Sequence, residues 1–286
     1  MIGYGQAIIL GLLQGFSELF PISSLGHSVI LPGLLGWDIH QNDDSFITFL
    51  VATHLATALV LLGFFRSDWA RILRGLGRSL RARRIDHDDP DAVLGWLLVV
   101  GTIPAGVVGL LLEHPLRSVF ASPASAAVFL MVNGLLLFAA ERLRRRAPVT
   151  EEGDPDGRIA ERLTWGSAFA IGTAQAAALI PGISRSGVTM GGSLRAGLSN
   201  EDAARFAFLL ATPIIGAAAL LKVPDLLGTQ GDGVRGPALV ASVCAAATAY
   251  LSVRFLMRFL QTHRLTPFAW YCLVAGAVAT VVLAVT

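Results

Sequence analysis

This sequence contains few charged residues for its size. Asp, Glu, Lys and Arg make up 15% of the 286 residues, whereas 54% are hydrophobic. A soluble protein with so little charge could not cover its own core. The net charge of +2 is also too small to indicate a nucleic-acid partner. The composition therefore predicts an integral membrane protein, which we expect to be all-α and polytopic.

Cysteine is scarce as well. Cys244 and Cys272 both lie in apolar runs, and the sequence has neither a CxxC pair nor a Cys/His cluster. Disulfides and a structural zinc site are therefore not expected. Lys222 is the only lysine, so the positions of the arginines describe where the positive charge lies along the chain.

Long apolar runs are abundant, and six of them can cross a membrane. A helix needs about 20 mostly apolar residues to span roughly 30 Å of hydrocarbon. We expect one membrane domain over residues 1–286, with six transmembrane helices. The expected spans are 46–65, 92–112, 123–140, 203–221, 237–257 and 268–285.

Two further apolar regions, 2–36 and 163–197, are interrupted by proline and glycine. The first is broken at Pro21-Ile-Ser-Ser-Leu-Gly26 and the second at Pro181-Gly-Ile-Ser-Arg-Ser-Gly187. Such density of proline and glycine ends a helix. An arm of about 12 residues rises roughly 18 Å and reaches about the middle of the membrane. We predict two re-entrant helical hairpins with polar tips, surrounded by protein or by a water-filled cavity.

Arginine predicts the orientation. Residues 66–91 carry seven arginines and 142–162 carry six, whereas 37–45 carries none and 114–122 only Arg117. The positive-inside rule assigns the two arginine-rich segments to the cytoplasm. Both termini are then external, the first hairpin enters from the outside and the second enters from the inside.

Each arginine-rich segment includes acidic residues. These are the stretches Asp86–Asp91 and Glu151–Asp156. We interpret both stretches as solvated loops.

An internal repeat relates the two halves of the chain. Phe49–Thr53 recurs as Phe208–Thr212. At a single offset of 161, further residues match in order: Gly11, Gln14, Ile22, Ser23 and Gly26 with Gly172, Gln175, Ile183, Ser184 and Gly187. The units are 1–141 and 163–286, each with one hairpin and three spans, so the second must be inverted. In inverted repeats with broken helices, the site typically lies where the breaks meet.

The first hairpin contains candidate acid and base groups. Glu18 is the only carboxylate in the first 37 residues. Because an ionised carboxylate is costly inside a membrane, it is a functional candidate, the alternative being a structural partner of a buried group. His27 can exchange a proton near neutral pH, although a lone histidine is often only a core residue. Ser23 and Ser24 lie between the two.

The second hairpin contains a candidate anion clamp. Arg185 lies in a turn that should open a short helix running through Thr189, and free N–H groups at a helix N-terminus favour an anion. The guanidinium adds bidentate recognition of phosphate oxygens. The alternative is that the hydroxyls only satisfy broken backbone. The expected phosphate-binding residues are Ser23, Gly182, Ser184, Arg185, Ser186, Gly187 and Thr189.

The two copies differ where chemistry is expected. Glu18 and His27 correspond to apolar residues of the second copy, and Arg185 corresponds to Ser24. One hairpin therefore supplies acid and base groups, and the other supplies an anion clamp. A diphosphate substrate needs both.

Two segments closely resemble the signature motifs of the bacterial undecaprenyl pyrophosphate phosphatase family, also called the bacitracin-resistance family. They are Gln14-Gly-Phe-Ser-Glu-Leu-Phe-Pro-Ile-Ser-Ser-Leu-Gly-His27 and Pro181-Gly-Ile-Ser-Arg-Ser-Gly-Val-Thr189, and the likeness includes Gly101–Ala105 and the segment ending at Pro213. The resemblance implies hydrolysis of undecaprenyl diphosphate to undecaprenyl phosphate and inorganic phosphate. This reaction recycles the carrier lipid of peptidoglycan synthesis and confers bacitracin resistance. The active-site positions are those of Glu18, Ser24, His27, Ser184, Arg185 and Thr189.

The resemblance also implies a divalent cation, Mg²⁺ or Ca²⁺, near Glu18. The first acidic position of the family's motif is Gln14 in this sequence, so the expected ligands are Glu18 with Gln14. Leu25 stands where threonine is common and His54 where glutamine is common. These departures leave room for an altered substrate or rate.

Several roles stay open at this point. Ser24 is the preferred nucleophile with His27 as general base or acid, but His27 or water could also attack. The alternative function is a flippase or transporter of a polyprenyl phosphate on the same scaffold. The expected partners are the polyprenyl diphosphate lipid, the bilayer and a second copy of the chain. We expect the bacterial plasma (inner) membrane, with the site opening towards its outer face.

Overall fold

A computed structural model describes residues 2–39, 43–120, 122–144, 153–228 and 231–285. No strand occurs in these ranges. The α-helices are α1 (Tyr4–Leu19), α2 (Ser24–Leu34), α3 (Asp44–Phe64), α4 (Arg66–Ala82), α5 (Pro90–Phe120), α6 (Pro123–Leu143), α7 (Pro155–Arg162), α8 (Trp165–Ala174), α9 (Arg185–Ala196), α10 (Asn200–Leu227), α11 (Arg235–Phe259) and α12 (Thr266–Val285), with a 3-10 turn η1 (Gln175–Leu179) between α8 and α9.

Six of these helices are long and apolar enough to cross a membrane, which confirms an all-α polytopic membrane protein. Each coincides with one of the six predicted spans, within a few residues at either end. The segments are Ser45–Phe64, Pro90–Leu111, Pro123–Leu143, Asn200–Lys222, Arg235–Phe259 and Thr266–Val285.

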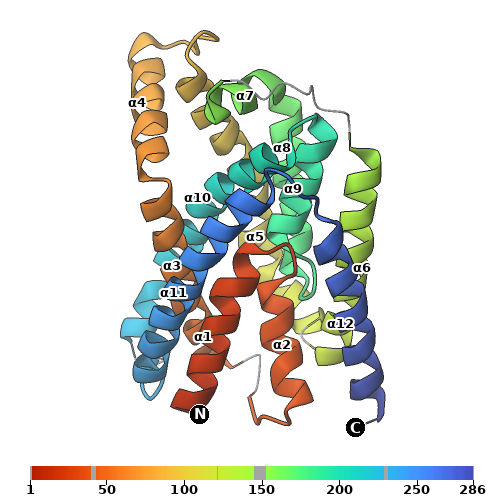
Figure 1. The fold of residues 1–286 in the computed structure, drawn as a ribbon. Coiled ribbons are helices and arrows are strands. Elements are labelled where there is room, and N and C mark those ends of the chain that lie inside the picture. The colour runs from red at the N-terminus through yellow and green to blue at the C-terminus, as the bar shows by residue number, and fades with distance from the viewer. Residues whose placement is uncertain (1, 40–42, 121, 145–152, 229–230, 286) are drawn as a thin grey trace.

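The two proline- and glycine-rich breaks form turns between helices. Residues 20–23 join α1 to α2, and residues 180–184 follow η1 and lead into α9. Figure 1 shows the two helical hairpins entering the bundle from opposite ends, with their turns meeting near its middle. Helix α1 begins and α12 ends at one end of the bundle, whereas α4 and α7 lie at the other. The position of the hairpins in a membrane and the inverted repeat stay predictions.

Glycines allow the hairpins to pack closely on the spanning helices. A Cβ atom on Gly11 or Gly15 of α1 would lie 2.3 or 2.1 Å from a carbonyl oxygen of α11. A Cβ on Gly172 of α8 would lie 2.2 Å from the Gly101 carbonyl oxygen of α5. Small residues that let backbones approach are typical of helix contacts in lipid. Gly11 and Gly172, which match in the internal repeat, therefore serve the same purpose.

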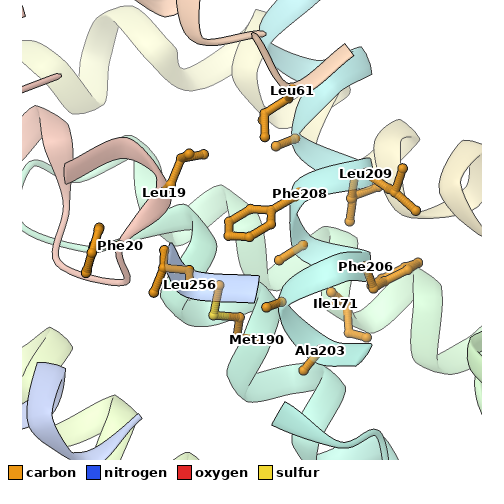
Figure 2. Close-up of a cluster of buried hydrophobic side chains, with 14 of the residues drawn as sticks. Leu19, Phe20, Leu61, Ile171, Met190, Ala203, Phe206, Phe208, Leu209 and Leu256 are labelled. Carbon is orange, nitrogen blue, oxygen red and sulfur yellow. The ribbon is translucent and has the colours of Figure 1, made fainter. Parts of the chain in front are cut away.

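The largest apolar cluster lies where the first hairpin tip meets the second half of the chain. Figure 2 shows Leu19 and Phe20 of the first hairpin near Met190 of α9, Phe208 of α10 and Leu256 of α11. Leu19, Met190, Phe208 and Leu256 are at most 1% exposed. The tip is thus enclosed by protein, as irregular backbone inside a membrane requires.

The interpretation of the acidic stretches as solvated loops was wrong for Asp156. This side chain is fully buried, accepts a hydrogen bond from Arg71 of α4 and forms an ion pair with Arg205 of α10 at 2.7 Å. Arg205 also contacts Asp68 of α4 at 2.9 Å. The arginine-rich segment after α3 is itself helical rather than a loop, because α4, α7 and α10 bury these charges together as matched pairs.

Candidate active site

The two hairpin tips are joined by reciprocal hydrogen bonds. The Ser23 hydroxyl donates to the Ile183 carbonyl at 3.1 Å, and the Ser186 hydroxyl donates to the Phe20 carbonyl at 3.2 Å. Gly182 has a φ of +103°, in the left-handed region that favours glycine. Two of the predicted phosphate ligands, Ser23 and Ser186, therefore use their hydroxyl protons to hold the tips together.

Glycine also sets the distance between the tips. A Cβ atom on Gly26 would lie 2.8 Å from the Gly182 Cα atom. A Cβ atom on Gly182 would lie 2.4 Å from the Ala126 carbonyl oxygen of α6. A larger residue at Gly26 would push the tips apart, and one at Gly182 would push the second tip away from α6, so Gly182 acts through backbone packing.

Asn133 of α6 connects both tips and was missed from the sequence. Its amide nitrogen donates to the Pro21 carbonyl at 2.9 Å, and its amide oxygen accepts from the Ser184 backbone N–H at 3.0 Å. The side chain is fully buried. An asparagine within a predicted apolar span was a usable signal, because polar groups in lipid almost always find partners in the protein.

Two helices begin at this junction. Ser23 caps α2 by accepting from the Gly26 N–H at 3.2 Å, and Ser184 caps α9 by accepting from the Gly187 N–H at 3.1 Å. Each helix N-terminus carries a partial positive charge and free N–H groups. Two such ends beside the Arg185 guanidinium make this point of the molecule favourable for an anion.

Glu18 is the centre of the polar cluster. Arg185 forms an ion pair with one of its oxygens at 2.5 Å. Ser24 and Gln14, the latter at 3.0 Å, donate to the other oxygen. His54 of α3 lies 3.3 Å from that same oxygen through its Nε2. The carboxylate is only 7% exposed, and its charge is balanced by donors from α1, α2, α3 and α9.

His54 had been noted only as a departure from a family motif. Its Nδ1 lies 2.8 Å from the Leu50 carbonyl oxygen of the same helix, which orients the ring towards Glu18. A titratable residue in the predicted span 46–65 was the signal that could have identified it. The structure thus brings a second histidine into the candidate site.

His27 contacts different residues. Its Nδ1 lies 2.7 Å from the Ser23 carbonyl oxygen, and its Nε2 lies 2.8 Å from the Tyr271 hydroxyl of α12. The two rings are stacked with centroids 5.8 Å apart. In the part of the chain that the structure describes, neither ring nitrogen of His27 bonds to Glu18 or Ser24.

The remaining predicted ligands are on the first turns of α9. The hydroxyls of Ser184 and Ser186 lie 3.0 Å apart, and the Thr189 hydroxyl donates to the Arg185 carbonyl at 2.8 Å. The Arg185 guanidinium also donates to the Ala211 carbonyl at 3.3 Å. Arg185 is therefore held at two points, with Glu18 as its counter-ion.

One buried polar atom beside Glu18 has no partner. The amide oxygen of Gln14 accepts no hydrogen bond from any residue that the structure describes, although the side chain is 1% exposed. An oxygen of this kind is a ligand that Mg²⁺ and Ca²⁺ accept. Among the described residues, no three His, Cys, Asp or Glu side chains lie close enough together to hold a metal ion. Glu18 and Gln14 fit a cation site that substrate phosphate oxygens and water would complete.

The fold and this site define a multi-pass membrane protein with a charged cluster buried where two broken helices meet. The chain belongs to the family described as Bacitracin resistance protein BacA, whose model matches residues 7–278.

Curated relatives are similar over nearly the whole chain. An undecaprenyl-diphosphatase of Mycolicibacterium paratuberculosis is 49% identical, over 99% of this chain and 98% of the relative. Undecaprenyl-diphosphatase 2 of Frankia alni is 44% identical over the same shares. An undecaprenyl-diphosphatase of Granulibacter bethesdensis is 48% identical, over 95% of this chain and 94% of the relative.

Proposed function

We propose that this protein hydrolyses undecaprenyl diphosphate to undecaprenyl phosphate and inorganic phosphate. The observation that carries the proposal is the Ser24–Glu18 pair beside Arg185 at two helix N-termini, enclosed by apolar helices. An anion clamp next to a nucleophile and its proton acceptor suits phosphoryl transfer from an anionic lipid. The names of the relatives support the same reaction and do not favour the flippase alternative.

Ser24 is the nucleophile in this proposal. Its hydroxyl already donates to Glu18, which would accept the proton as Ser24 Oγ attacks the terminal phosphorus. The bond from that phosphorus to the bridging oxygen breaks, and polyprenyl phosphate leaves. Water then cleaves the phosphoserine ester, releasing inorganic phosphate.

The two histidines have separate roles. His54 orients Glu18 for Ser24 through its contact with the shared carboxylate oxygen. His27 is the proposed acid or base for the leaving oxygen or for water, and to act there its Nε2 must release the Tyr271 hydroxyl. Ser184, Thr189 and the N–H groups of α9, with Gly187 near its start, surround the phosphate beside Arg185.

A divalent cation, Mg²⁺ or Ca²⁺, is part of the proposal. Glu18 and the unpartnered Gln14 oxygen would hold it, and it would supply neutralisation of phosphate charge. A chelator should therefore slow phosphate release and weaken substrate binding.

We further propose an inner-membrane protein whose termini are external and whose site opens towards the outer face. The arginine-rich helix α4 lies at the end of the bundle opposite to the start of α1, which supports that orientation under the positive-inside rule. The hairpins would then be re-entrant. The homodimer expected from the sequence stays a prediction.

The test is phosphate release by the purified protein in detergent, supplied with undecaprenyl diphosphate. Release should require Ser24 and fall on chelation, and Ser24→Ala should bind the lipid without cleaving it. Ser28, one turn further along α2, is also buried, and its hydroxyl bonds to no described residue, so Ser28→Ala is the matched control. Absence of release, together with lipid transfer across proteoliposomes, would favour the flippase instead.

A further inference from the structure

Helix α11 has one face that the described parts of the other helices leave exposed. Leu239, Val243, Leu251 and Phe255 lie along it at helical spacing, each at least 50% exposed. In a membrane-spanning helix such a face contacts lipid chains. The face ends in two exposed arginines, Arg254 and Arg258. These arginines therefore lie at the surface and not in the protein interior.

A shallow, open cavity of about 360 Å³ lies at this end of α11. Residues of α11 and of the turn after it line the cavity: Leu251, Arg254, Phe255, Arg258, Phe259, Thr262 and His263. Its lining is thus cationic on one side and apolar on the other. This is the chemistry of a lipid headgroup region.

The positive charges in the cavity have no counter-ion in the described part of the protein. Arg254 and Arg258 are four residues apart on a helix, where like charges repel. Neither forms an ion pair with a described acidic residue, whereas Arg158 and Arg205 at the same end are each paired with an aspartate. The Nδ1 atom of His263 lies 2.8 Å from the Thr262 hydroxyl oxygen, and no described residue bonds to its Nε2.

The apolar side is a row of stacked rings. Phe255 and Phe259 have centroids 5.4 Å apart, and Phe259 and His263 have centroids 4.3 Å apart. The row continues to Phe20 at the first hairpin tip, whose ring lies 5.9 Å from that of Phe255. Such a wall suits the first carbons of a lipid chain whose headgroup lies between the arginines.

We propose that this cavity, lined by Arg254, Arg258 and His263, binds the headgroup of an anionic phospholipid. A single negative headgroup between the two guanidinium groups relieves their repulsion and leaves the acyl chains along the apolar face of α11. A zwitterionic lipid offers no net charge to offset. The site is separate from Glu18 and Ser24 and does not depend on the reaction assigned to them.

The experiment is native mass spectrometry of the full chain in neutral detergent, titrated with phosphatidylglycerol or phosphatidylcholine. The parent should bind phosphatidylglycerol more tightly than phosphatidylcholine. Replacing both arginines, as Arg254→Gln with Arg258→Gln, should weaken phosphatidylglycerol binding by roughly thirtyfold. The matched control is Arg81→Gln with Arg83→Gln, two exposed arginines of α4 and its C-cap, which should bind like the parent.

A lysine pair keeps the test decisive if the glutamine pair does not fold. Arg254→Lys with Arg258→Lys retains both charges and should keep the preference for phosphatidylglycerol, because headgroup attraction needs charge rather than a planar fork. Loss of the preference in this pair would overturn the proposal. Equal phosphatidylglycerol binding by the glutamine pair and the α4 control, or equal binding of the two lipids by the parent, would do so too.

Discussion

At the scale of the residue, Glu18 concentrates the charge of the candidate site on one carboxylate. Arg185, Ser24, Gln14 and His54 all contact it, and they come from four different helices. A buried charge of this kind is tolerated because its partners satisfy it. Removing a partner should therefore affect stability and chemistry in ways that can be separated.

The Arg185 clamp can be tested by keeping its charge. Arg185→Lys retains a cation but cannot make bidentate contact with phosphate, so turnover should fall about 100-fold with the protein still folded. Arg185→Ala should be worse, and it leaves Glu18 without its ion-pair partner. Breaking a buried pair costs about 3–5 kcal/mol of unfolding free energy, less here to the extent that His54 compensates.

The double variant distinguishes stability from catalysis. Glu18→Gln together with Arg185→Ala removes both charges and should recover thermal stability without recovering activity. Phosphate release and the melting temperature in detergent measure the two effects. Hydrolysis at the parental rate by Arg185→Lys would show that the clamp is not part of the mechanism.

The role of His54 can be tested with variants that keep or remove a hydrogen-bond donor at this position. His54→Gln keeps an N–H group that can reach Glu18, whereas His54→Leu keeps bulk without a donor. A hydrogen bond to a charged group contributes about 1.5–3 kcal/mol, so His54→Leu should lower kcat by roughly 10- to 100-fold with little change in KM. His54→Gln should restore most of kcat. Equal rates in the two variants would assign His54 to packing alone.

At the scale of the element, the position of Glu18 depends on how closely α1 approaches α11. Gly15 lies between Gln14 and Glu18 and faces the backbone of α11, where a Cβ atom would be 2.1 Å from the Ala245 carbonyl oxygen. The alanines of α11 recur every fourth residue along this contact, as Ala241, Ala245 and Ala249. The contact therefore depends on small residues from both helices.

Gly15→Ala should therefore force the two helices apart. The overpacked contact is expected to cost about 1–3 kcal/mol, and because α1 carries Glu18, activity should fall as well. Gly216→Ala in α10 is the matched control, since a Cβ atom there meets nothing within 4 Å. Denaturation in mixed detergent and phosphate release provide the measurements. A parental stability for Gly15→Ala would mean that this contact adjusts freely.

At the scale of the whole molecule, arginine is concentrated at the end of the bundle that holds α4. The end with α4 and α7 holds paired arginines and aspartates, including the buried Asp156 with Arg71 and Arg205. The opposite end contains the start of α1 and the end of α12. The positive-inside rule predicts that the arginine-rich end faces the cytoplasm.

Cysteine labelling in intact cells tests that orientation. Asp43→Cys lies between the first hairpin and α3, and an impermeant thiol reagent should label it from outside. Arg83→Cys at the end of α4 should be labelled only after the membrane is opened. The parent chain serves as the background, because Cys272 is buried and Cys244 is partly buried. The reverse labelling pattern would invert the proposed topology.

The sequence by itself determined the class of protein, the six spans, the two helix breaks and the most polar residues at those breaks. These are local properties, since hydropathy, proline and glycine act within a few residues of chain. Glu18 and Arg185 were identifiable singly because an ionised side chain in an apolar segment is costly wherever it points.

Only the tertiary structure decided which groups share a site. His54 reaches Glu18 from α3, and Asn133 joins two tips that lie far apart in sequence. His27, which the sequence predicts to act with Ser24, contacts the Tyr271 hydroxyl instead. Each of these contacts depends on how separate helices pack, and small residues set that packing at backbone contact distance. Local sequence does not encode such distances, because they arise only when residues from separate helices, distant in the chain, are brought together.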